Sequence, residues 1–308
     1  MEIYLPIAEQ SMNVFILLGL GAAAGLLAGM FGVGGGFLAT PLLIFVGIPP
    51  AVAVASQANQ VIANSVSSLQ VQWRRGNVDL RMGLVLLLGG MIGSSAGVSL
   101  FTYLKHIGQI DFVIAVLYVV MLSSIGVLML AETLRTYLRR RRNPEAPRGK
   151  LHNHYLVHRL PLKLRFYKSK LYISALLPLG LGFVIGILSA ILGVGGGFVL
   201  VPAMIYLLGM PTSVVIGTSN FQILFVAANV TFLQAATNGT VDVVLALLLI
   251  LGGVVGAPVG SRLAAKLSGV ALRGLMAVLI LAVAVELLTQ LLQTPSSIYS
   301  LGAREVLP

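Results

Sequence analysis

The sequence predicts an all-α polytopic membrane protein made of two inverted repeats with broken, glycine-rich segments. Of its 308 residues, 57% are hydrophobic and only 9% are charged, whereas a soluble domain carries about a quarter charged residues. Long apolar runs recur from Ser11 to Gln290. The third observation is a repeat, because the stretch GVGGGF at 32–37 returns at 193–198.

The repeated glycine stretch is unfavourable for a continuous helix, since glycine loses more backbone freedom on ordering than any other residue. Inside a membrane, irregular backbone is tolerated only where protein or a water-filled cavity surrounds it. Transporters place paired broken segments at their binding sites. We therefore expect the glycines of both copies to contact a substrate: Gly34, Gly35, Gly36, Gly195, Gly196 and Gly197.

The apolar segments of the first half run over residues 12–31, 37–48, 51–72, 82–103 and 110–131, and those of the second half over 172–191, 198–209, 212–236, 242–263 and 269–292. The second segment of each half is too short to cross a hydrocarbon core of about 30 Å as a helix. The sequence thus predicts about eight full transmembrane helices plus two short ones, each a half-helix or one arm of a re-entrant hairpin. The expected divisions are a first membrane repeat at 1–131, a basic cytoplasmic linker at 132–171 and a second membrane repeat at 172–308.

Further landmarks recur in the same order in both halves. The Gly47–Pro49 turn matches Gly209–Pro211, and Gly76–Asp79 matches Gly239–Asp242. A set of spaced glycines also returns, and it forms a small-residue face that lets helices pack closely. These glycines are Gly89, Gly90, Gly93 and Gly97 in the first half and Gly252, Gly253, Gly256 and Gly260 in the second.

The net charge of +11 is concentrated between the halves, because twelve of the twenty Lys and Arg residues lie at 135–170. Cytoplasmic loops are enriched in Lys and Arg, so we expect this linker in the cytoplasm, in contact with anionic lipid headgroups and not with nucleic acid. The basic loop Trp73–Gly76 is expected on the same side, whereas its counterpart at 237–240 has no basic residue. This opposite alternation predicts inverted repeats in the inner cell membrane, with both termini outside.

The third segment of each half carries neutral polar side chains. Ser56 and Gln60 match Thr218 and Gln222 at equal spacing, which keeps each pair on one helical face. Such residues often serve as interhelical hydrogen-bonding groups. Beside two helix breaks they can instead hold an anion without a buried charge, and in inverted repeats the amides of Gln60 and Gln222 would converge on the glycine stretches. The expected substrate-binding set is Ser56, Gln57, Asn59, Gln60, Thr218, Ser219, Asn220 and Gln222.

Several classes of function are disfavoured by what the sequence lacks. The absence of cysteine rules out thiolate catalysis, disulfides and thiolate metal sites. GVGGGF lacks the Gly-Lys-Ser/Thr ending of a phosphate-binding loop and does not match GxGxxG. Coupling carboxylates usually lie inside the membrane, and only Glu286 lies well inside an apolar segment. We expect no enzyme activity, no cofactor and no metal site.

At these residues the sequence resembles the sulfite exporter TauE/SafE family of membrane transporters. The similarity covers residues 12–103 and 172–292 and rests on the paired G-x-G-G-G-x4-P motif and on Gly217–Ser219. The first half departs from the second motif, with Ala55–Gln57 in place of Gly-Thr-Ser. The resemblance implies movement of sulfur-containing anions such as sulfite or organosulfonates, usually outward.

The sequence leaves several functions open. The first is a secondary transporter that exports small sulfur-containing oxyanions by alternating access. The alternatives are an anion-selective channel with the glycine stretches as its filter, a transporter of a non-sulfur organic anion, and a membrane scaffold, which has no need of paired helix breaks. The expected partner is a small anionic substrate, and a homo-oligomer is compatible with the sequence.

Overall fold

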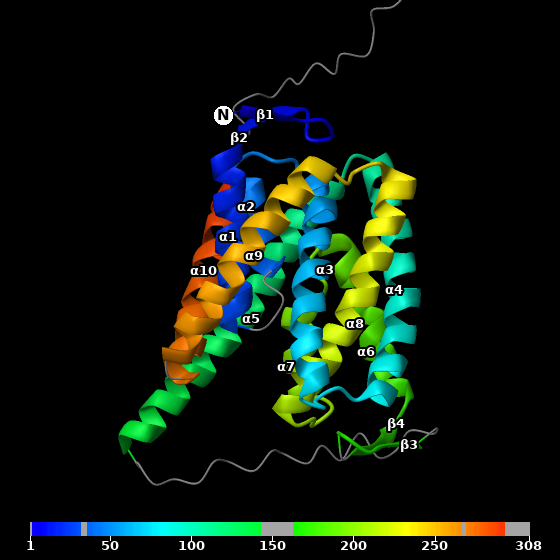
Figure 1. The fold of residues 1–308 in the computed structure, drawn as a ribbon, viewed down its shortest axis with the longest axis vertical. Coiled ribbons are helices and arrows are strands. Elements are labelled where there is room, and N and C mark those ends of the chain that lie inside the picture. The colour runs from blue at the N-terminus through cyan, green and yellow to red at the C-terminus, as the bar shows by residue number, and fades with distance from the viewer. Residues whose placement is uncertain (1, 32–35, 143–162, 170, 267–268, 293–308) are drawn as a thin grey trace, which may run out of the picture.

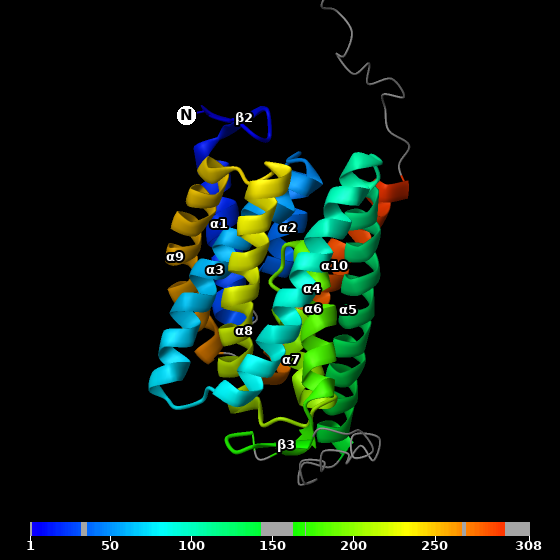
Figure 2. The same ribbon diagram turned by 90° about the vertical axis from the view of Figure 1, so that its right-hand side faces the viewer.

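A bundle of α-helices with a short β-hairpin at either end forms the part of the chain described by the computed structural model, which covers residues 2–31, 36–142, 163–169, 171–266 and 269–292 (Figure 1). The hairpins lie at opposite ends of the bundle, and the long helices run between these ends (Figures 1 and 2).

Both halves of the chain have the same order of elements, a hairpin followed by five helices. The first half contains β1 (Glu2–Leu5), β2 (Gln10–Asn13), α1 (Val14–Phe31), α2 (Gly36–Phe45), α3 (Pro50–Arg74), α4 (Leu80–His106) and α5 (Ile110–Arg142). The second half contains β3 (Lys163–Phe166), β4 (Leu171–Ser174), α6 (Leu176–Leu192), α7 (Gly197–Tyr206), α8 (Thr212–Leu233), α9 (Val243–Lys266) and α10 (Gly269–Leu292). A π-helical turn, η2 (Gln234–Asn238), extends α8.

Five helices of the described chain are long and apolar enough to cross a membrane, judged by length and composition: α4, α5, α8 with η2, α9 and α10. Helices α2 and α7 have 10 residues each, which is about 15 Å of helix, so they are short as predicted. Helix α3 has 25 residues but carries the polar stretch that includes Ser56 and Gln70. The expected number of eight full spans stays a prediction.

Glycines hold two helix pairs in close contact, α1 with α9 and α4 with α6. A Cβ atom added at Gly21 would lie 2.6 Å from the carbonyl oxygen of Leu249, and one added at Gly182, the matching residue of α6, would overlap the carbonyl oxygen of Leu86. Only residues without a side chain let two backbones approach this closely. Each pair joins a helix of one half to a helix of the other, so the two halves are interlocked.

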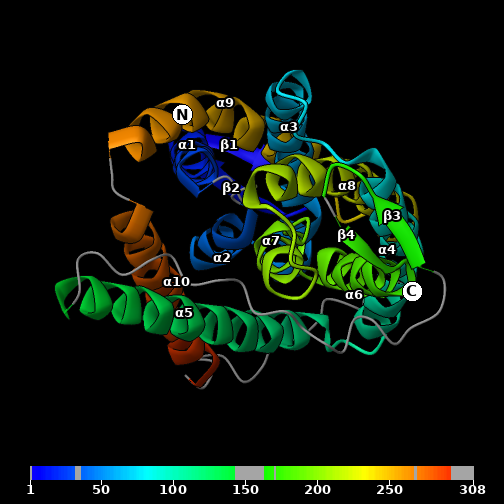
Figure 3. The same cartoon turned by 90° about the horizontal axis from the view of Figure 1, so that it is seen from below.

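Helices α3 and α8 pack on each other on one side of the short helices α2 and α7, whereas α5 and α10 form a pair along the opposite side (Figure 3). Tyr118 of α5 and Ile280 of α10 are fully buried in one apolar cluster, together with Phe37 of α2 and Phe198 of α7. The α5–α10 pair therefore covers one side of the two short helices.

Two buried aspartates fix the hairpins to the bundle. Asp79 precedes α4, where its Oδ1 accepts the N–H of Met82 at 3.2 Å, while its Oδ2 accepts the N–H and the hydroxyl of Ser169 at 3.0 and 2.6 Å. Asp242 precedes α9, and its two oxygens accept the N–H groups of Leu245 and Ile7, both at 3.0 Å. Each carboxylate caps a helix and holds a hairpin turn, so the layout is the same in both halves.

Regular secondary structure extends into the predicted linker at 132–171. Helix α5 continues to Arg142, past the apolar segment that ends at 131, because its last turns are charged and carry no apolar pattern. Part of the predicted linker at 132–171 forms the β3–β4 hairpin, which follows the β1–β2 hairpin by 161 residues at every paired position. Residues 143–162 of that linker lie outside the described residues.

The glycine contacts generate a stability prediction. Gly21→Ala and Gly182→Ala place a methyl group against a carbonyl of the facing helix, and overpacking of this kind costs about 1–3 kcal/mol. We expect both variants to have a lower melting temperature in detergent than the wild type. Gly19 and Gly180 are matched controls, since an added Cβ meets nothing within 4 Å at either position. A loss of stability as large in Gly19→Ala and Gly180→Ala would contradict the prediction.

Candidate functional site

The second glycine stretch connects α6 to α7 by a turn that only glycine can form without strain. Gly193, Gly195 and Gly196 have φ angles of +67°, +68° and +73°, the left-handed region that residues with a Cβ rarely adopt. A Cβ at Gly193 would also overlap the carbonyl oxygen of Val54. The positive φ angles and the close contact with Val54 therefore explain why glycine occupies these positions, whether or not a substrate binds there. The matching Gly34 and Gly35 of the first half lie outside the described residues.

Equivalent residues of the two halves meet at this turn. The rings of Phe37 and Phe198, which are the same position of the repeat, stack with their centroids 5.5 Å apart. A Cβ at Gly36 would lie 3.3 Å from the backbone of Val194. The tyrosine hydroxyl of Tyr118 donates a hydrogen bond to the carbonyl of Leu192, the last residue of α6. The starts of α2 and α7 therefore face each other inside the bundle.

One face of α3 lies against both short helices. A Cβ atom added at Gly36 would lie 2.7 Å from the side chain of Val61, and one added at Gly195 would lie 2.5 Å from it. Gln57 and Ser65 lie one turn to either side of Val61, so they share its helical face. Both are fully buried, and the Oε1 atom of Gln57 and the hydroxyl of Ser65 have no hydrogen-bond partner. These two atoms are buried polar groups without a partner, one helical turn to either side of Val61.

The start of α7 adds N–H groups to this region. An α-helix leaves its first N–H groups without partners inside the helix, and the residue that precedes α7, Gly196, provides no side-chain cap. Helix N-termini carry a partial positive charge, which favours an anion. Within the described residues no Lys or Arg is buried, so an anion here would be held by neutral donors.

Ser56 and Thr218 connect the two halves. The hydroxyl oxygen of Ser56 accepts the N–H of Asp242, and that of Thr218 accepts the N–H of Asp79, both at 3.0 Å. Each hydroxyl thus binds the residue that precedes α9 or α4. The sequence placed both residues in the substrate site, and their binding of substrate stays a prediction.

Gln60 is turned toward α1 and α9. Its Nε2 donates to the carbonyl oxygens of Gly21 at 3.1 Å and Leu249 at 3.0 Å, and its Oε1 accepts from Gln57 Nε2 at 2.8 Å. Because both amide hydrogens are used, Gln60 has none to donate to an anion. The expectation that Gln60 would orient the substrate stays a prediction.

Gln222 has the matching place on α8 but no partner. Its Nε2 would lie 2.7 Å from a Cβ at Gly90, just as Gln60 Nε2 would lie 2.6 Å from one at Gly253. Both amide atoms of Gln222 are nevertheless unpaired. Gln57 is replaced by Ser219 in this half, and the hydroxyl of Ser219 donates to the carbonyl of Ile216. Gln60 and Gln222 therefore face different helix pairs and do not converge on the glycine turn.

The two asparagines of the predicted set differ in their surroundings. Asn59 is half-buried and makes a long hydrogen bond of 3.4 Å to the carbonyl of Ser56. Asn220 is buried, and its Nδ2 donates to Ser68 Oγ at 2.9 Å and to the carbonyl of Ile216 at 2.7 Å. Asn220 thus links α8 to α3. These two hydrogen bonds explain the buried asparagine without a role in substrate binding.

Sequence reasoning gave no role to Asp79 and Asp242, which it placed at segment ends. Each aspartate follows a matching glycine, Gly76 or Gly239, by three residues. This repeated spacing was the signal in the sequence that could have indicated a shared role. Glu286 is exposed on α10. Over the described residues, no group of three or more His, Asp and Glu side chains could hold a metal ion.

Comparisons with known proteins agree with a membrane role. The model of a family described as "Sulfite exporter TauE/SafE" matches residues 17–287. The chain is 30% identical to the "Probable membrane transporter protein YjnA" of Bacillus subtilis over 283 residues, which is 90% of this chain and 100% of that protein. It is 29% identical to a "Probable membrane transporter protein" of Xylella fastidiosa over 83% of this chain and 87% of that protein. No solved structure shows significant similarity to the chain.

The contrast between the two glutamines generates a prediction. Gln60→Leu removes three hydrogen bonds and leaves the buried Nε2 of Gln57 without an acceptor, and an orphaned group of this kind costs about 1–3 kcal/mol. Gln222→Leu removes an amide that has no partner, so we expect its melting temperature in detergent to equal or exceed that of the wild type. A comparable loss of stability in both variants would mean that Gln222 is bonded as Gln60 is.

Proposed function

The chain belongs to the sulfite exporter TauE/SafE family of membrane transporters, and we propose that it is a secondary transporter of small sulfur-containing oxyanions, such as sulfite or organosulfonates, which it exports by alternating access. Members and relatives are membrane transporters, not enzymes. The observation that carries the mechanism is the meeting of the starts of α2 and α7, where the two halves contact each other through equivalent residues.

We propose that the two halves are inverted repeats. Three observations support this: the hairpins lie at opposite ends of the bundle (Figure 1), the aspartate contacts to Ile7 and Ser169 are equivalent in the two halves, and α1–α9 matches α6–α4. A pseudo-two-fold axis through the Phe37–Phe198 stack would relate them. Such symmetry gives a transporter two related conformations, open to opposite sides.

We propose that the anion binds at the glycine turn, between the start of α7 and the Gln57–Ser65 face of α3. Orphan N–H groups of the first helical turn would donate to its oxygens. The unpaired hydroxyl of Ser65 would donate one further hydrogen bond. The glycines add no side chains of their own at this point, so an anion would have to displace only the side chains of Val61, Ile185 and Ile223 that lie against them. The other polar residues of the predicted set would act mainly by holding the helices around this point.

We propose that the protein lies in the inner cell membrane, with the β3–β4 end of the bundle in the cytoplasm. Arg74, Arg81, Lys168 and Arg262 are exposed basic residues in or beside the hairpin, the α3–α4 connection and the end of α9, which lie at one end of the bundle (Figures 1 and 3). The opposite hairpin carries Glu2 and Glu9 and no Lys or Arg. The positive-inside rule favours the basic end in the cytoplasm, with both termini outside.

The function is tested by flux into proteoliposomes. Labelled sulfite, sulfoacetate, taurine and sulfate are offered with and without a pH gradient. Saturable uptake of a sulfur oxyanion, with counter-movement of an ion, is the expected result. Large non-saturating conductance would identify a channel, and saturable uptake restricted to carboxylates would identify a non-sulfur organic anion transporter.

Ser65 provides a prediction about the binding site. Ser65→Ala should raise the half-saturating substrate concentration by roughly tenfold or more, because a hydrogen bond to a charged group is worth about 1.5–3 kcal/mol. Ser67 is the matched control, since it is exposed and its hydroxyl donates to the carbonyl of Ala63. Equal half-saturation in Ser65→Ala, Ser67→Ala and wild-type protein would place the substrate elsewhere.

The orientation is tested by cysteine labelling, for which the absence of cysteine in this chain is an advantage. A cysteine at Asn77, between α3 and α4, should react with a membrane-impermeant maleimide only after the cells are opened. A cysteine at Asn238, before α9, should react in intact cells. Labelling of both positions from the same side would contradict inverted repeats.

A further inference from the structure

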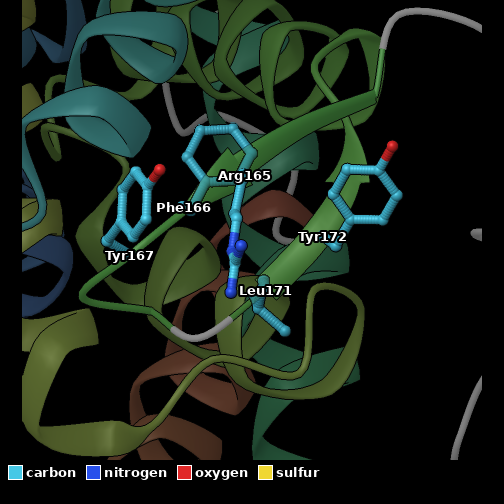
Figure 4. Close-up of a pocket in the computed structure, with 5 residues that line it drawn as sticks. All are labelled: Arg165, Phe166, Tyr167, Leu171 and Tyr172. Atoms are coloured by element: carbon cyan, nitrogen blue, oxygen red, sulfur yellow. The ribbon is translucent and has the colours of Figure 1, made fainter.

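A cavity of about 520 Å³ opens on the β3–β4 hairpin, at one end of the bundle (Figures 1 and 4). Its lining residues are Arg165, Phe166, Tyr167, Leu171 and Tyr172. Binding sites for small ligands usually have volumes of about 300–1,000 Å³, so a headgroup-sized molecule fits. The predicted partner for this part of the chain was an anionic lipid surface, and the cavity gives that contact a defined place.

The hairpin presents different chemistry on its two faces. Arg165 pairs with Tyr172 across the strands, and Phe166 pairs with Leu171, so the two pairs face opposite sides of the hairpin. Phe166 is 1% exposed and belongs to an apolar cluster under the hairpin. Figure 4 shows the Arg165 side chain between Tyr167 and Tyr172. The face with Arg165 and Tyr172 is open, since Tyr172 is 56% exposed.

Two arginines converge on Tyr167. The guanidinium carbon of Arg165 lies 5.4 Å from the centre of the Tyr167 ring, and that of Arg81, from the first turn of α4, lies 5.1 Å from it. Contact with a ring uses the face of a guanidinium and leaves its N–H groups at the edge. Among the described residues neither arginine has an acidic partner. Guanidinium groups with free donors are suited to the oxygens of a phosphate, and of the two Arg165 is the one that lines the cavity.

The first-half hairpin shows that this lining is not needed to build the fold. It has the same strand register and the same aspartate contact as β3–β4. At the positions of Arg165, Tyr167 and Tyr172 it carries Tyr4, Pro6 and Ser11. The arginine and the Tyr167–Tyr172 pair are therefore special to one end of the bundle, which also carries most of the exposed basic residues, whereas Lys105 lies at the opposite end.

We propose that this cavity binds the phosphate group of an anionic phospholipid, with Arg165 on the phosphate oxygens, with Arg81 adding positive charge next to Tyr167, and with Tyr167 and Tyr172 at the boundary between headgroup and acyl chain. Tyrosines are enriched at this depth of a membrane, and the cytoplasmic leaflet is rich in anionic lipids that attract Lys and Arg. A soluble phosphate or sulfonate has similar oxygens but gains nothing from the two exposed rings. This site rests on the proposed orientation but not on the proposed transport activity.

The test measures binding of lipid to the full-length protein in detergent, by native mass spectrometry and by the shift in melting temperature. The probes are phosphatidylglycerol, phosphatidylcholine and the soluble headgroup glycerol phosphate. We expect phosphatidylglycerol to bind and stabilise the wild type more than phosphatidylcholine does, and glycerol phosphate to have little effect. In Arg81→Gln/Arg165→Gln the apparent dissociation constant for phosphatidylglycerol should rise roughly tenfold or more.

Two further variants keep the test decisive. Arg262→Gln/Lys266→Gln removes the same number of charges from exposed positions near the end of α9, and it should bind phosphatidylglycerol as the wild type does. Arg81→Lys/Arg165→Lys keeps the charge and should recover part of the affinity even where the glutamine variant folds poorly. Equal loss in the α9 variant would overturn the proposal in favour of general charge attraction. Equal stabilisation by glycerol phosphate would overturn it in favour of a soluble anion.

Discussion

The backbones of α1 and α9, and those of α4 and α6, touch because glycines line both helices of each pair. In a membrane this packing has to supply much of the association energy, since lipid chains are as apolar as the side chains they replace. Each pair unites one half of the chain with the other, so neither half can complete its own packing alone. Helices α3 and α8 are then confined between the pairs, and the short helices α2 and α7 are enclosed with them. The close approach also brings the carbonyls of Gly21 and Leu249 within reach of Gln60.

The parts of the fold that repeat locally were predictable from the sequence. The glycine faces, the short second helices and the order of elements follow from residues that recur at constant spacing. The roles of the polar residues were not predictable in the same way, because their partners are distant in sequence. Nothing near Gln60 indicates that its acceptors are carbonyls on α1 and α9, and nothing near Ser56 indicates that it binds the N–H of Asp242. The hairpins were missed because their four-residue strands are too short for an alternating pattern to be seen.

Duplication gives two copies of each contact, and the differences between the copies show where the chain is free to specialise. The aspartate caps are retained in both halves, since each holds a hairpin and starts a helix. Gln57 donates a hydrogen bond to the amide of Gln60, whereas Ser219, at the matching position, donates to the carbonyl of Ile216. The amide of Gln60 therefore has partners and that of Gln222 has none. A buried amide without partners costs about 1–3 kcal/mol. The second half carries this cost at Gln222, whereas the first half carries it at Gln57 Oε1 and at the hydroxyl of Ser65.

The lack of buried Lys and Arg in the described chain has a consequence for an anion carrier. A fixed buried cation would pair strongly with an oxyanion and would have to be stabilised by another group after the anion left. Neutral donors avoid this problem, because N–H groups of a helix start are less costly to leave empty than a bare charge. Two or three hydrogen bonds to a charged group, at about 1.5–3 kcal/mol each, correspond to gross binding in the millimolar to micromolar range, before the cost of ordering the ligand is subtracted. Binding of that strength holds an anion long enough for a conformational change and still lets it leave on the other side. The glycine turn beside Ser65 has the composition that such moderate binding requires.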